Sequence, residues 1–225
     1  GGTFIAGHFT GPVNFGGPTL TSVGHADIFV VRLEPGGALD WAVRYGSANT
    51  DSIYDLAVDP SGDPVIVGVH AAPISFGTGS TFTPTDFDAF VVRLSAADGH
   101  ARWAVPLSGA GYEGVTAVAV DSLAVTVVGT HDAGLVVGST HLIDVSASNG
   151  FVIRLRLSTG ALDWAQGVTG ASATVISVSD VAVDRWNGRV VVAGSLAGGW
   201  AALDAEVLWP NTGSFGSTGF VAVVN

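Results

Sequence analysis

The sequence predicts an all-β protein, a β-propeller of about four four-stranded blades, of which the first and last are incomplete. Two observations lead to this prediction. The apolar segment FVVRL at residues 29–33 returns at residues 90–94 and, as FVIRL, at residues 151–155, which is a 61-residue repeat. The composition favours strands joined by tight turns, because Gly is abundant (32 residues), Val is frequent and Lys is absent.

Four sequence landmarks recur in the same order. A strand-like segment ends in a glycine, a phenylalanine opens the FVVRL segment, a tryptophan follows it, and an AVD-type segment ends in an aspartate. The members are Gly7, Gly68, Gly129 and Gly194; Phe29, Phe90, Phe151 and Phe220; Trp41, Trp103 and Trp164; and Asp59, Asp121 and Asp184. Such regular spacing is typical of a repeat protein, whose units stack on one another.

Each unit contains four short β-type runs, which we number in chain order from the AVD-type run. Turn residues separate the first run from the second at 60–63, and the third from the fourth at 34–37 and 158–160. Because side chains alternate along a strand, Phe29, Val31 and Leu33 should face one neighbouring blade and Val30 and Arg32 the other. Stacking on both faces explains why these runs are apolar throughout.

The unit boundaries fall at residues 1–46, 47–107, 108–168 and 169–225, within a single domain. The chain starts with a second run and stops at a third, so the first and last units are incomplete. Open sheet edges are a liability that proteins normally avoid. We therefore expect either a fragment of a larger ring or chains that complete one another's blades.

The charge balance argues against two classes of partner. The formal net charge is −11, with only eight basic residues, all Arg. Nucleic acids and anionic bilayers attract Lys and Arg, so neither is an expected partner. No run approaches the roughly 18 apolar residues of a spanning helix, so we expect no membrane insertion. There is no Cys, which excludes disulfides and thiolate chemistry.

Nearly the whole chain resembles a bacterial β-propeller repeat family, the SBBP repeats. The resemblance lies in LAVDPSGDPVIVG (residues 56–68), ISFGTG (74–79) and DAFVVRLSAADGHARWA (88–104). It is weaker in the later units, where Val137 stands in place of the motif's Phe and residues 200–210 are extra. The resemblance implies an exported or surface-exposed bacterial protein and brings no catalytic residue with it.

A weaker resemblance concerns LSTGALDWA at residues 157–165. It is similar to a hairpin in the propeller repeats of pyrroloquinoline-quinone dehydrogenases, in which the Trp packs between blades. It implies an interblade packing role for Trp41, Trp103 and Trp164. The residues that would bind such a cofactor are not recognisable here, so we expect no cofactor.

Two sets of residues are weak metal candidates. Asp59 and Asp63 have a spacing that calcium loops use, although a plain hairpin turn explains them equally. His70 and His131 are 61 residues apart and could share a metal between blades, although ordinary loop or edge histidines explain them as well. His8 lies one residue out of step and should face the other way.

Acidic residues offer further candidates. Asp27 and Asp88 precede the repeated Phe by two residues, where Asn149 and Thr218 stand in the later units. They could ring one mouth of a channel, or cap the turn that leads into each strand. The pairs Asp86 with Asp88 and Asp204 with Glu206 could serve glycoside cleavage, although solvated turn acids are the plainer interpretation.

Trp186, Trp200 and Trp209 lie outside the repeated Trp position, all in the irregular last unit. An exposed aromatic cluster could bind a glycan or a protein, whereas local core packing is the alternative. These three residues are the sequence's best candidates for a partner-binding surface.

The sequence therefore predicts a non-catalytic structural or binding scaffold of an exported, cell-surface or periplasmic protein. Its long loops, residues 10–23 and 71–86, would recognise a protein or a glycan. One alternative is a self-assembling subunit, a homo-oligomer that completes blades between chains. Another is a channel-centred enzyme of the hydrolase, lyase or quinoprotein type.

Overall fold

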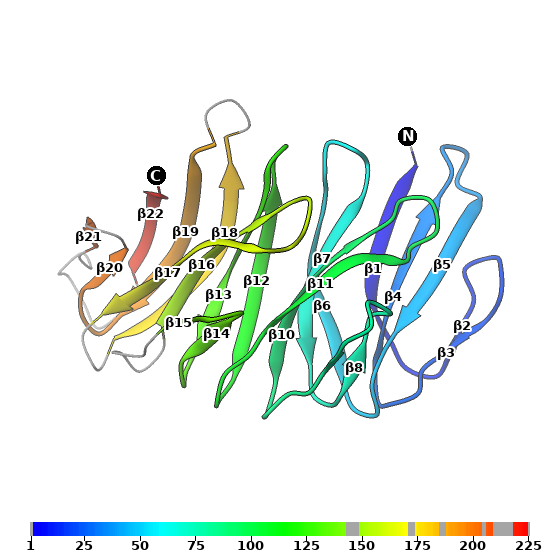
Figure 1. Cartoon of the computed structure of the whole chain (residues 1–225), viewed down its shortest axis with the longest axis horizontal. Coiled ribbons are helices and arrows are strands. Elements are labelled where there is room, and N and C mark those ends of the chain that lie inside the picture. Colours follow the sequence, from blue (N-terminus) through cyan, green and yellow to red (C-terminus); the bar gives the residue numbers. More distant parts are fainter. Residues whose placement is uncertain are drawn as a thin grey trace.

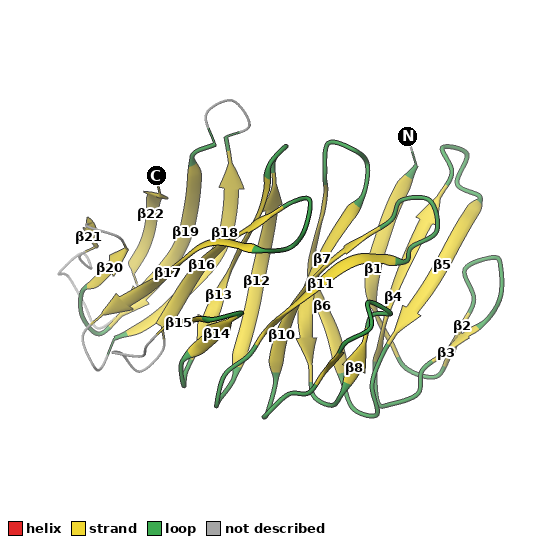
Figure 2. Ribbon diagram, viewed as in Figure 1, coloured by secondary structure: helices red, strands yellow, loops and turns green. Residues whose placement is uncertain are grey.

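The structure, a computed structural model, describes residues 2–142, 149–170, 174–184, 188–203, 206–208 and 218–224. Every regular element among them is a β-strand, so the all-β prediction is confirmed (Figure 2). None of these residues forms a helix of the length and apolarity that crossing a membrane would require. Branched side chains such as Val pack well on a pleated surface, which favours strands here.

Within the described residues, the long strands form four antiparallel sheets that follow one another in a row along the chain (Figure 1). Sheet one contains β1 (Thr3–Phe9), β4 (Asp27–Leu33) and β5 (Leu39–Tyr45). Sheet two contains β6 (Asp51–Val58), β7 (Pro64–His70), β10 (Asp88–Leu94) and β11 (Ala101–Leu107). Sheet three contains β12 (Glu113–Val120), β13 (Ala124–His131), β16 (Asn149–Arg156) and β17 (Leu162–Gly170). Sheet four contains β18 (Val175–Val183), β19 (Val190–Ala197) and β22 (Thr218–Val224).

The strands occupy the four positions that the sequence pattern defines. The first strands are β6, β12 and β18, and the second strands are β1, β7, β13 and β19. The third strands are β4, β10, β16 and β22, and the fourth are β5, β11 and β17. Each strand pairs with the next in this order, as in β6–β7, β7–β10 and β10–β11.

The connections from second to third strands carry small hairpins. They are β2 (Pro12–Val13) with β3 (Leu20–Thr21), β8 (Ile74–Ser75) with β9 (Thr81–Phe82), and β14 (Leu135–Val137) with β15 (Thr140–Leu142). In the last connection, β20 (Ala201–Leu203) and β21 (Glu206–Leu208) extend sheet three instead, because β20 pairs with the end of β17. We call this end of the stack the hairpin rim.

These connections reach back to the preceding sheet. Ser108, directly after β11, exchanges backbone hydrogen bonds with Val136 of the β14–β15 hairpin. Phe76, directly after β8, packs against Tyr45 of sheet one with ring centroids 5.2 Å apart. The hairpin rim is therefore built jointly by neighbouring sheets.

Apolar side chains fill the space between neighbouring sheets. Ile66, Phe90 and Val92 of sheet two pack with Ile28 and Val30 of sheet one. All five side chains are fully buried. This cluster fixes the two sheets face to face.

The opposite face of sheet two packs on sheet three. Val91, between Phe90 and Val92, points to that side and joins a cluster with Phe151. One residue further, Val152 points to sheet four and packs with Val192. The repeated segments therefore alternate between neighbouring sheets, as the sequence pattern predicts.

Each first strand has one extra residue, a β-bulge, near its middle. The bulges lie between Ile53 and Asp55, between Val115 and Ala117, and between Val178 and Asp180. Around these bulges the first strands bond to one another across sheets. The Asp55 carboxylate accepts the Val118 N–H at 2.9 Å, and the Thr116 hydroxyl donates to the Val178 carbonyl at 2.6 Å.

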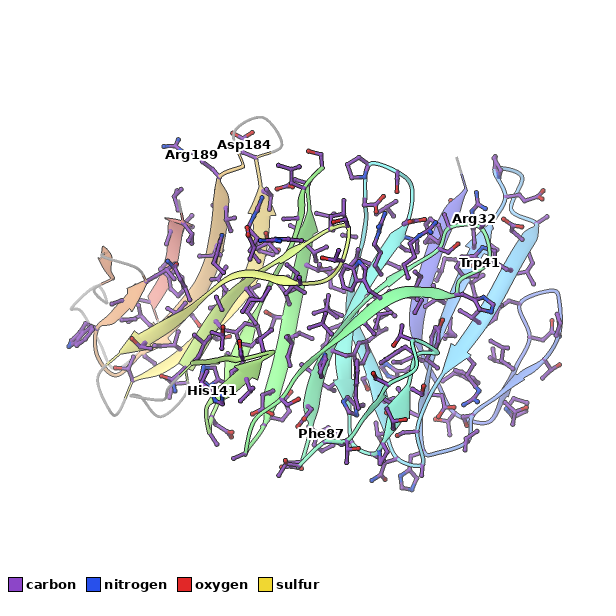
Figure 3. The ribbon with its side chains drawn as sticks, in the orientation of Figure 1. Arg32, Trp41, Phe87, His141, Asp184 and Arg189 are labelled. Carbon is purple, nitrogen blue, oxygen red and sulfur yellow. The ribbon has the colours of Figure 1, made fainter. Side chains whose placement is uncertain are left out.

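Near the opposite end of the stack, the fourth strands β5 and β11 are each bonded to the next sheet. The Trp41 indole N–H donates to the Ala96 carbonyl, and the Trp103 indole N–H donates to the Leu157 carbonyl, both at 2.9 Å. Arg32, the cross-strand partner of Trp41, donates to the same Ala96 carbonyl at 3.1 Å (Figure 3). We call these contacts the tryptophan latches.

Candidate functional site

A row of buried polar side chains crosses sheets two and three at the hairpin rim. In sheet two the row consists of Asp51, His70 and Asp88, which are cross-strand neighbours; in sheet three it consists of Glu113, His131 and Asn149. None of the six is more than 2% exposed. The six residues lie at one level because the strands are antiparallel. The first and third strands therefore begin beside the point where the second strand ends.

A pair of acidic side chains lies at the junction of sheets one and two, and an arginine is its counter-ion. Asp27 of β4 is fully buried and forms an ion pair with Arg44 of β5. Asp51 of β6 lies close enough for its pKa to respond to Asp27, and accepts hydrogen bonds from the backbone and hydroxyl of Ser47 at 2.6 and 2.9 Å. Burial raises the pKa of Asp51 to about 6, and the Ser47 bonds oppose that rise.

Sheets two and three meet at the equivalent acid pair, Asp88 and Glu113. Both side chains are buried, and among the described residues no arginine forms an ion pair with either. No hydrogen bond of ordinary geometry reaches the Glu113 carboxylate oxygens. Burial, together with the nearby charge of Asp88, raises the pKa of Glu113 to about 8. At neutral pH the Glu113 carboxyl group is therefore mostly protonated.

The second junction lacks a cation because of the residue that its fourth strand carries at the equivalent position. Arg44 of β5 pairs with Phe29, and Pro106 of β11 pairs with Phe90 at the same place. In β17 that place is held by Gly167, opposite Phe151. Sheets three and four have no acid pair, since uncharged Asn149 and Ile176 stand there. The Asp88–Glu113 pair is thus singled out by its lack of a neutralising arginine.

A cavity of about 460 Å³ opens beside this pair, between sheet two and the β14–β15 hairpin. Its walls include Thr85, Ser108, Gly109, Gly134, Leu135 and, on β15, His141 (Figure 3). A methyl group on Gly109 would lie 2.2 Å from Glu113 Oε1. Gly109 therefore lies between contacts with the cavity and with the buried acid. We call this space the rim cavity.

The rim cavity offers apolar contact with a few polar groups. Its hydroxyl, imidazole and backbone groups can orient a ligand, and small side chains leave space for it. Because the pKa of Glu113 is raised to about 8, its carboxyl group adds little negative charge beside the cavity at neutral pH. This arrangement suits an uncharged or weakly basic group.

The acidic candidates from the sequence have different surroundings. The Asp27 carboxylate accepts the N–H groups of Val23 and Gly24, so it does cap the turn before β4. Asp86 is exposed whereas Asp88 is buried, so the two do not form a pair. The description of Asp88 as a solvated turn acid is wrong, because its side chain lies between two sheets. Asp204 lies outside the described residues, as does the side chain of Glu206.

The carboxylates of Asp59 and Asp63 form hydrogen bonds and ion pairs with other residues of this chain. The Asp59 carboxylate accepts the Ser61 N–H at 2.7 Å and ion-pairs with Arg93 at 2.7 Å. Asp63 ion-pairs with Arg93 and Arg102. Burial alone would raise the pKa of Asp59, but the Ser61 hydroxyl, the Asp63 N–H and Arg93 outweigh it and hold the pKa below its ordinary value. This geometry is that of a hairpin turn tied to β10.

His70 and His131 are not loop or edge residues, and that interpretation is wrong. Both end second strands that pair on both sides, and both side chains are buried. His8 is exposed, one position out of step. Burial lowers the pKa of His70, so it is neutral at pH 7. No group of three or more His, Asp or Glu in the described part of the chain is arranged to hold a metal ion.

Of the three tryptophan candidates, the structure describes Trp200 alone. Trp186 and Trp209 lie outside the described residues. Trp200 is 39% exposed, and its carbonyl accepts a hydrogen bond from Thr174. Trp41 and Trp103, in contrast, form the latches described above, and Trp164 packs against the apolar cluster between sheets three and four.

Sequence reasoning missed Asp51 and Glu113. A signal was present, because each begins the AVD-type run, and they are 62 residues apart. Their importance depends on facing Asp27 and Asp88 across a junction, which no local pattern reveals. No family model matches the chain, and no curated protein matches its sequence.

Proposed function

We propose that this chain is a non-catalytic binding scaffold of the β-propeller type, and that it holds a segment of a protein partner at the rim cavity. The rim cavity, which two neighbouring sheets build together, is the observation that carries the proposal. Rigid sheets that present short connections are a common basis for recognition.

The propeller component has two supports. The sheets stack face to face through three apolar clusters, and each long strand stands at its repeat position. Four-stranded antiparallel units that stack in this way are the blades of propellers. About four blades with a 61-residue repeat, the first and last incomplete, is the architecture that we propose.

The lining of the rim cavity favours a protein segment over a glycan. Of its described wall residues, His141 alone carries an aromatic ring, whereas sugars usually stack on Trp or Tyr. Leu135 and Leu142 supply apolar contact, and Ser108 supplies a hydroxyl. An exported or cell-surface location follows from the resemblance to SBBP repeats and is part of the same proposal.

A peptide library displayed on phage and selected against the 225-residue chain tests this function. Ala110 is exposed at the cavity wall, so Ala110→Trp should fill the cavity without disturbing the fold. Peptides selected by the unchanged chain should bind the variant roughly tenfold or more weakly, a loss of about 1.4 kcal/mol.

The matched control is Leu123→Trp, which adds the same ring at a residue that is 76% exposed in the turn between β12 and β13, away from the hairpin rim. Its affinity for the selected peptides should be unchanged. Peptides that bind all three chains equally would exclude the rim cavity, and selective binding on a glycan array with no peptide enrichment would replace the protein partner with a sugar.

A further inference from the structure

At the junction of sheets one and two, this chain supplies donors to both buried acids. Arg44 forms an ion pair with Asp27. Ser47, four residues before Asp51, donates its backbone N–H and its hydroxyl to the Asp51 carboxylate at 2.6 and 2.9 Å. A cation and a hydroxyl therefore serve two carboxyl groups that are fully buried.

At the junction of sheets two and three, both of these donors are missing. Pro106 takes the place of the arginine. Gly109, four residues before Glu113, takes the place of the serine and has no hydroxyl. Asp88 and the Gly111 backbone lie near the Glu113 carboxyl group, but no hydrogen bond of ordinary geometry reaches its oxygens. The acid pair therefore lacks the cation and the hydroxyl that the first junction provides.

Both acids of this pair contact residues that line the rim cavity. The Asp88 carboxylate accepts the N–H of Thr85 at 3.4 Å, and Thr85 lines the cavity. Gly109 and Gly134 line it as well, and a Cβ on Gly109 would lie 2.2 Å from Glu113 Oε1 and 2.2 Å from the Gly134 carbonyl oxygen. Two carboxyl groups and a carbonyl oxygen thus gather behind one part of the cavity wall.

We propose that the rim cavity binds a primary amine in its ammonium form, which supplies to Asp88 and Glu113 the cation that Arg44 supplies at the first junction. An ammonium group has three N–H donors and no acceptor, which matches two carboxyl groups and the Gly134 carbonyl. The Arg44 side chain is 31% exposed and pairs with a fully buried acid, so a cation at the surface of this rim reaches such a carboxylate. The net charge of −11 attracts the ligand.

The inference rests on the proposed function for the source of the amine, a lysine side chain of the partner segment. The methylene stem of a lysine would pack on Leu135 and Leu142 of the cavity wall. This chain contains no Lys, so a second copy has no such side chain to insert. An amine that is free in solution has the same head group, and the experiments below separate the two sources.

Binding of the ammonium group should expel the proton that Glu113 holds. The pKa of Glu113 is about 8 without the ligand, and a nearby positive charge favours the ionised form. Affinity for the amine should therefore rise with pH from about 6 to about 8, by up to about tenfold per pH unit, and level off above that. The other titratable side chains around the acid pair and the cavity are His70, His131, Asp132 and His141.

Isothermal titration calorimetry with N-acetyl-lysine methylamide tests the site directly. This compound should bind the 225-residue chain roughly tenfold or more tightly than N-acetylnorleucine methylamide, which has the same stem without the amine. Titrations in two buffers of different ionisation enthalpy at pH 7 should show the release of about half a proton or more per bound amine. Equal affinity for the two compounds, or binding without proton release, would overturn the proposal.

Two variants assign the effect to the acid pair. Pro106→Arg places a cation of this chain at the pair and should weaken the binding of the lysine compound roughly tenfold. Glu113→Gln should abolish the proton release. The matched control is Asp163→Asn, at an acid near the turn between β16 and β17, and it should leave affinity and proton release unchanged.

A measurement on the unchanged chain decides the question if the variants do not fold. In a nuclear magnetic resonance titration, a saturating concentration of the lysine compound should lower the pKa of the Glu113 carboxyl group. The norleucine compound should leave this pKa unchanged. An identical Glu113 titration with and without the lysine compound would contradict the proposal.

Two outcomes separate this inference from the proposed function. Selected peptides that Ala110→Trp weakens, but that carry no Lys and release no proton, would overturn the amine site and leave the rim cavity as a peptide site. Binding of the lysine compound with proton release, when no peptide is enriched, would support the amine site with a free amine as its ligand and contradict the partner protein.

Discussion

At the scale of single residues, the three junctions between neighbouring sheets carry different side chains at the same buried position. Asp27 is paired with Arg44, the Glu113 carboxyl group beside Asp88 holds a proton, and Asn149 and Ile176 carry no charge. A second buried charge without a partner is costly, so each junction removes it by a different means. Two junctions contain a carboxyl group with a raised pKa, Asp51 at about 6 and Glu113 at about 8, and only Glu113 stays mostly protonated at neutral pH.

The raised pKa of Glu113 predicts a pH effect on stability. The folded pKa of Glu113, about 8, lies above its ordinary value of 4.5, so the folded state holds a proton that the unfolded state loses. The free energy of unfolding should therefore fall as pH rises from about 4.5 to about 8, and level off above that. Glu113→Gln should remove the slope between about pH 6 and 8, because the other raised acid, Asp51, has a pKa of about 6, and it should be more stable than the unchanged chain at pH 8.5, by about 1–3 kcal/mol.

Denaturant unfolding from pH 4 to 9 measures this effect. The control is Asp163→Asn, at a partly exposed acid whose nearest cation, Arg156, is 3.7 Å away. It should keep the slope of the unchanged chain. Parallel curves for Glu113→Gln and the unchanged chain would show that Glu113 does not hold the proton.

Pro106→Arg tests the same idea by adding the missing cation. Arg44 reaches Asp27 from the position opposite Phe29, and Pro106 stands opposite Phe90. An arginine there should pair with Asp88, lower the pKa of the acid pair and stabilise the fold at pH 8.5 by about 1 kcal/mol. Nuclear magnetic resonance titration of the carboxyl groups should show the lowered pKa; an unchanged titration would contradict the equivalence of the two positions.

At the scale of strands and turns, the sequence carried much of the information. The turn glycines Gly37, Gly62 and Gly160 have positive φ angles of 85°, 95° and 72°, at the turns that the sequence predicts. The alternation of Phe90 and Val91 between neighbouring sheets also follows from a period of two residues. Both are local properties, which is why a single sequence reveals them.

The features that the sequence did not reveal depend on distant contacts. Glu113 meets Asp88 only because two sheets stack, and the β20–β21 pair joins sheet three although it follows β19 in the chain. The interpretation of His70 as a loop or edge residue is wrong because the β8–β9 hairpin covers that strand end, where the Phe82 ring lies 6.4 Å from the His70 ring. Spacing alone cannot report which elements cover a strand end.

The tryptophan latches predict a difference between two Trp→Phe substitutions. Trp103 is 7% exposed, and its indole N–H bonds to the Leu157 carbonyl, so Trp103→Phe removes a buried donor. The free energy of unfolding should fall by about 1–3 kcal/mol. Trp200→Phe, at a residue that is 39% exposed, should change it by less than about 0.5 kcal/mol. Equal losses in chemical denaturation would mean that the latch bond contributes nothing.

At the scale of the whole molecule, each apolar cluster joins neighbouring sheets. One cluster lies between sheets one and two, one between two and three, and one between three and four. Stability in such a row is a sum of unit and nearest-neighbour contributions. A substitution that destabilises one junction should therefore affect mainly the two sheets that form this junction.

Two Ile→Val substitutions test this locality. Ile66 and Ile153 are both fully buried, in the first and second clusters respectively, and each change should cost about 0.5–1.5 kcal/mol. Amide hydrogen exchange should quicken in sheets one and two for Ile66→Val, and in sheets two and three for Ile153→Val. Uniform quickening over the whole chain in both variants would mean that the stack unfolds as one unit.

Each tryptophan latch joins a residue to an acceptor that comes later in the chain, and this order affects folding during synthesis. Trp41 bonds to a carbonyl 55 residues later in the chain, and Trp103 to one 54 residues later. Synthesis proceeds from the N-terminus. The indole N–H of each latch therefore cannot form its hydrogen bond until the following unit has left the ribosome. Nascent sheets should lock one by one, each about one unit behind the point of elongation, and a ribosome stalled within a unit should leave the newest tryptophan exposed.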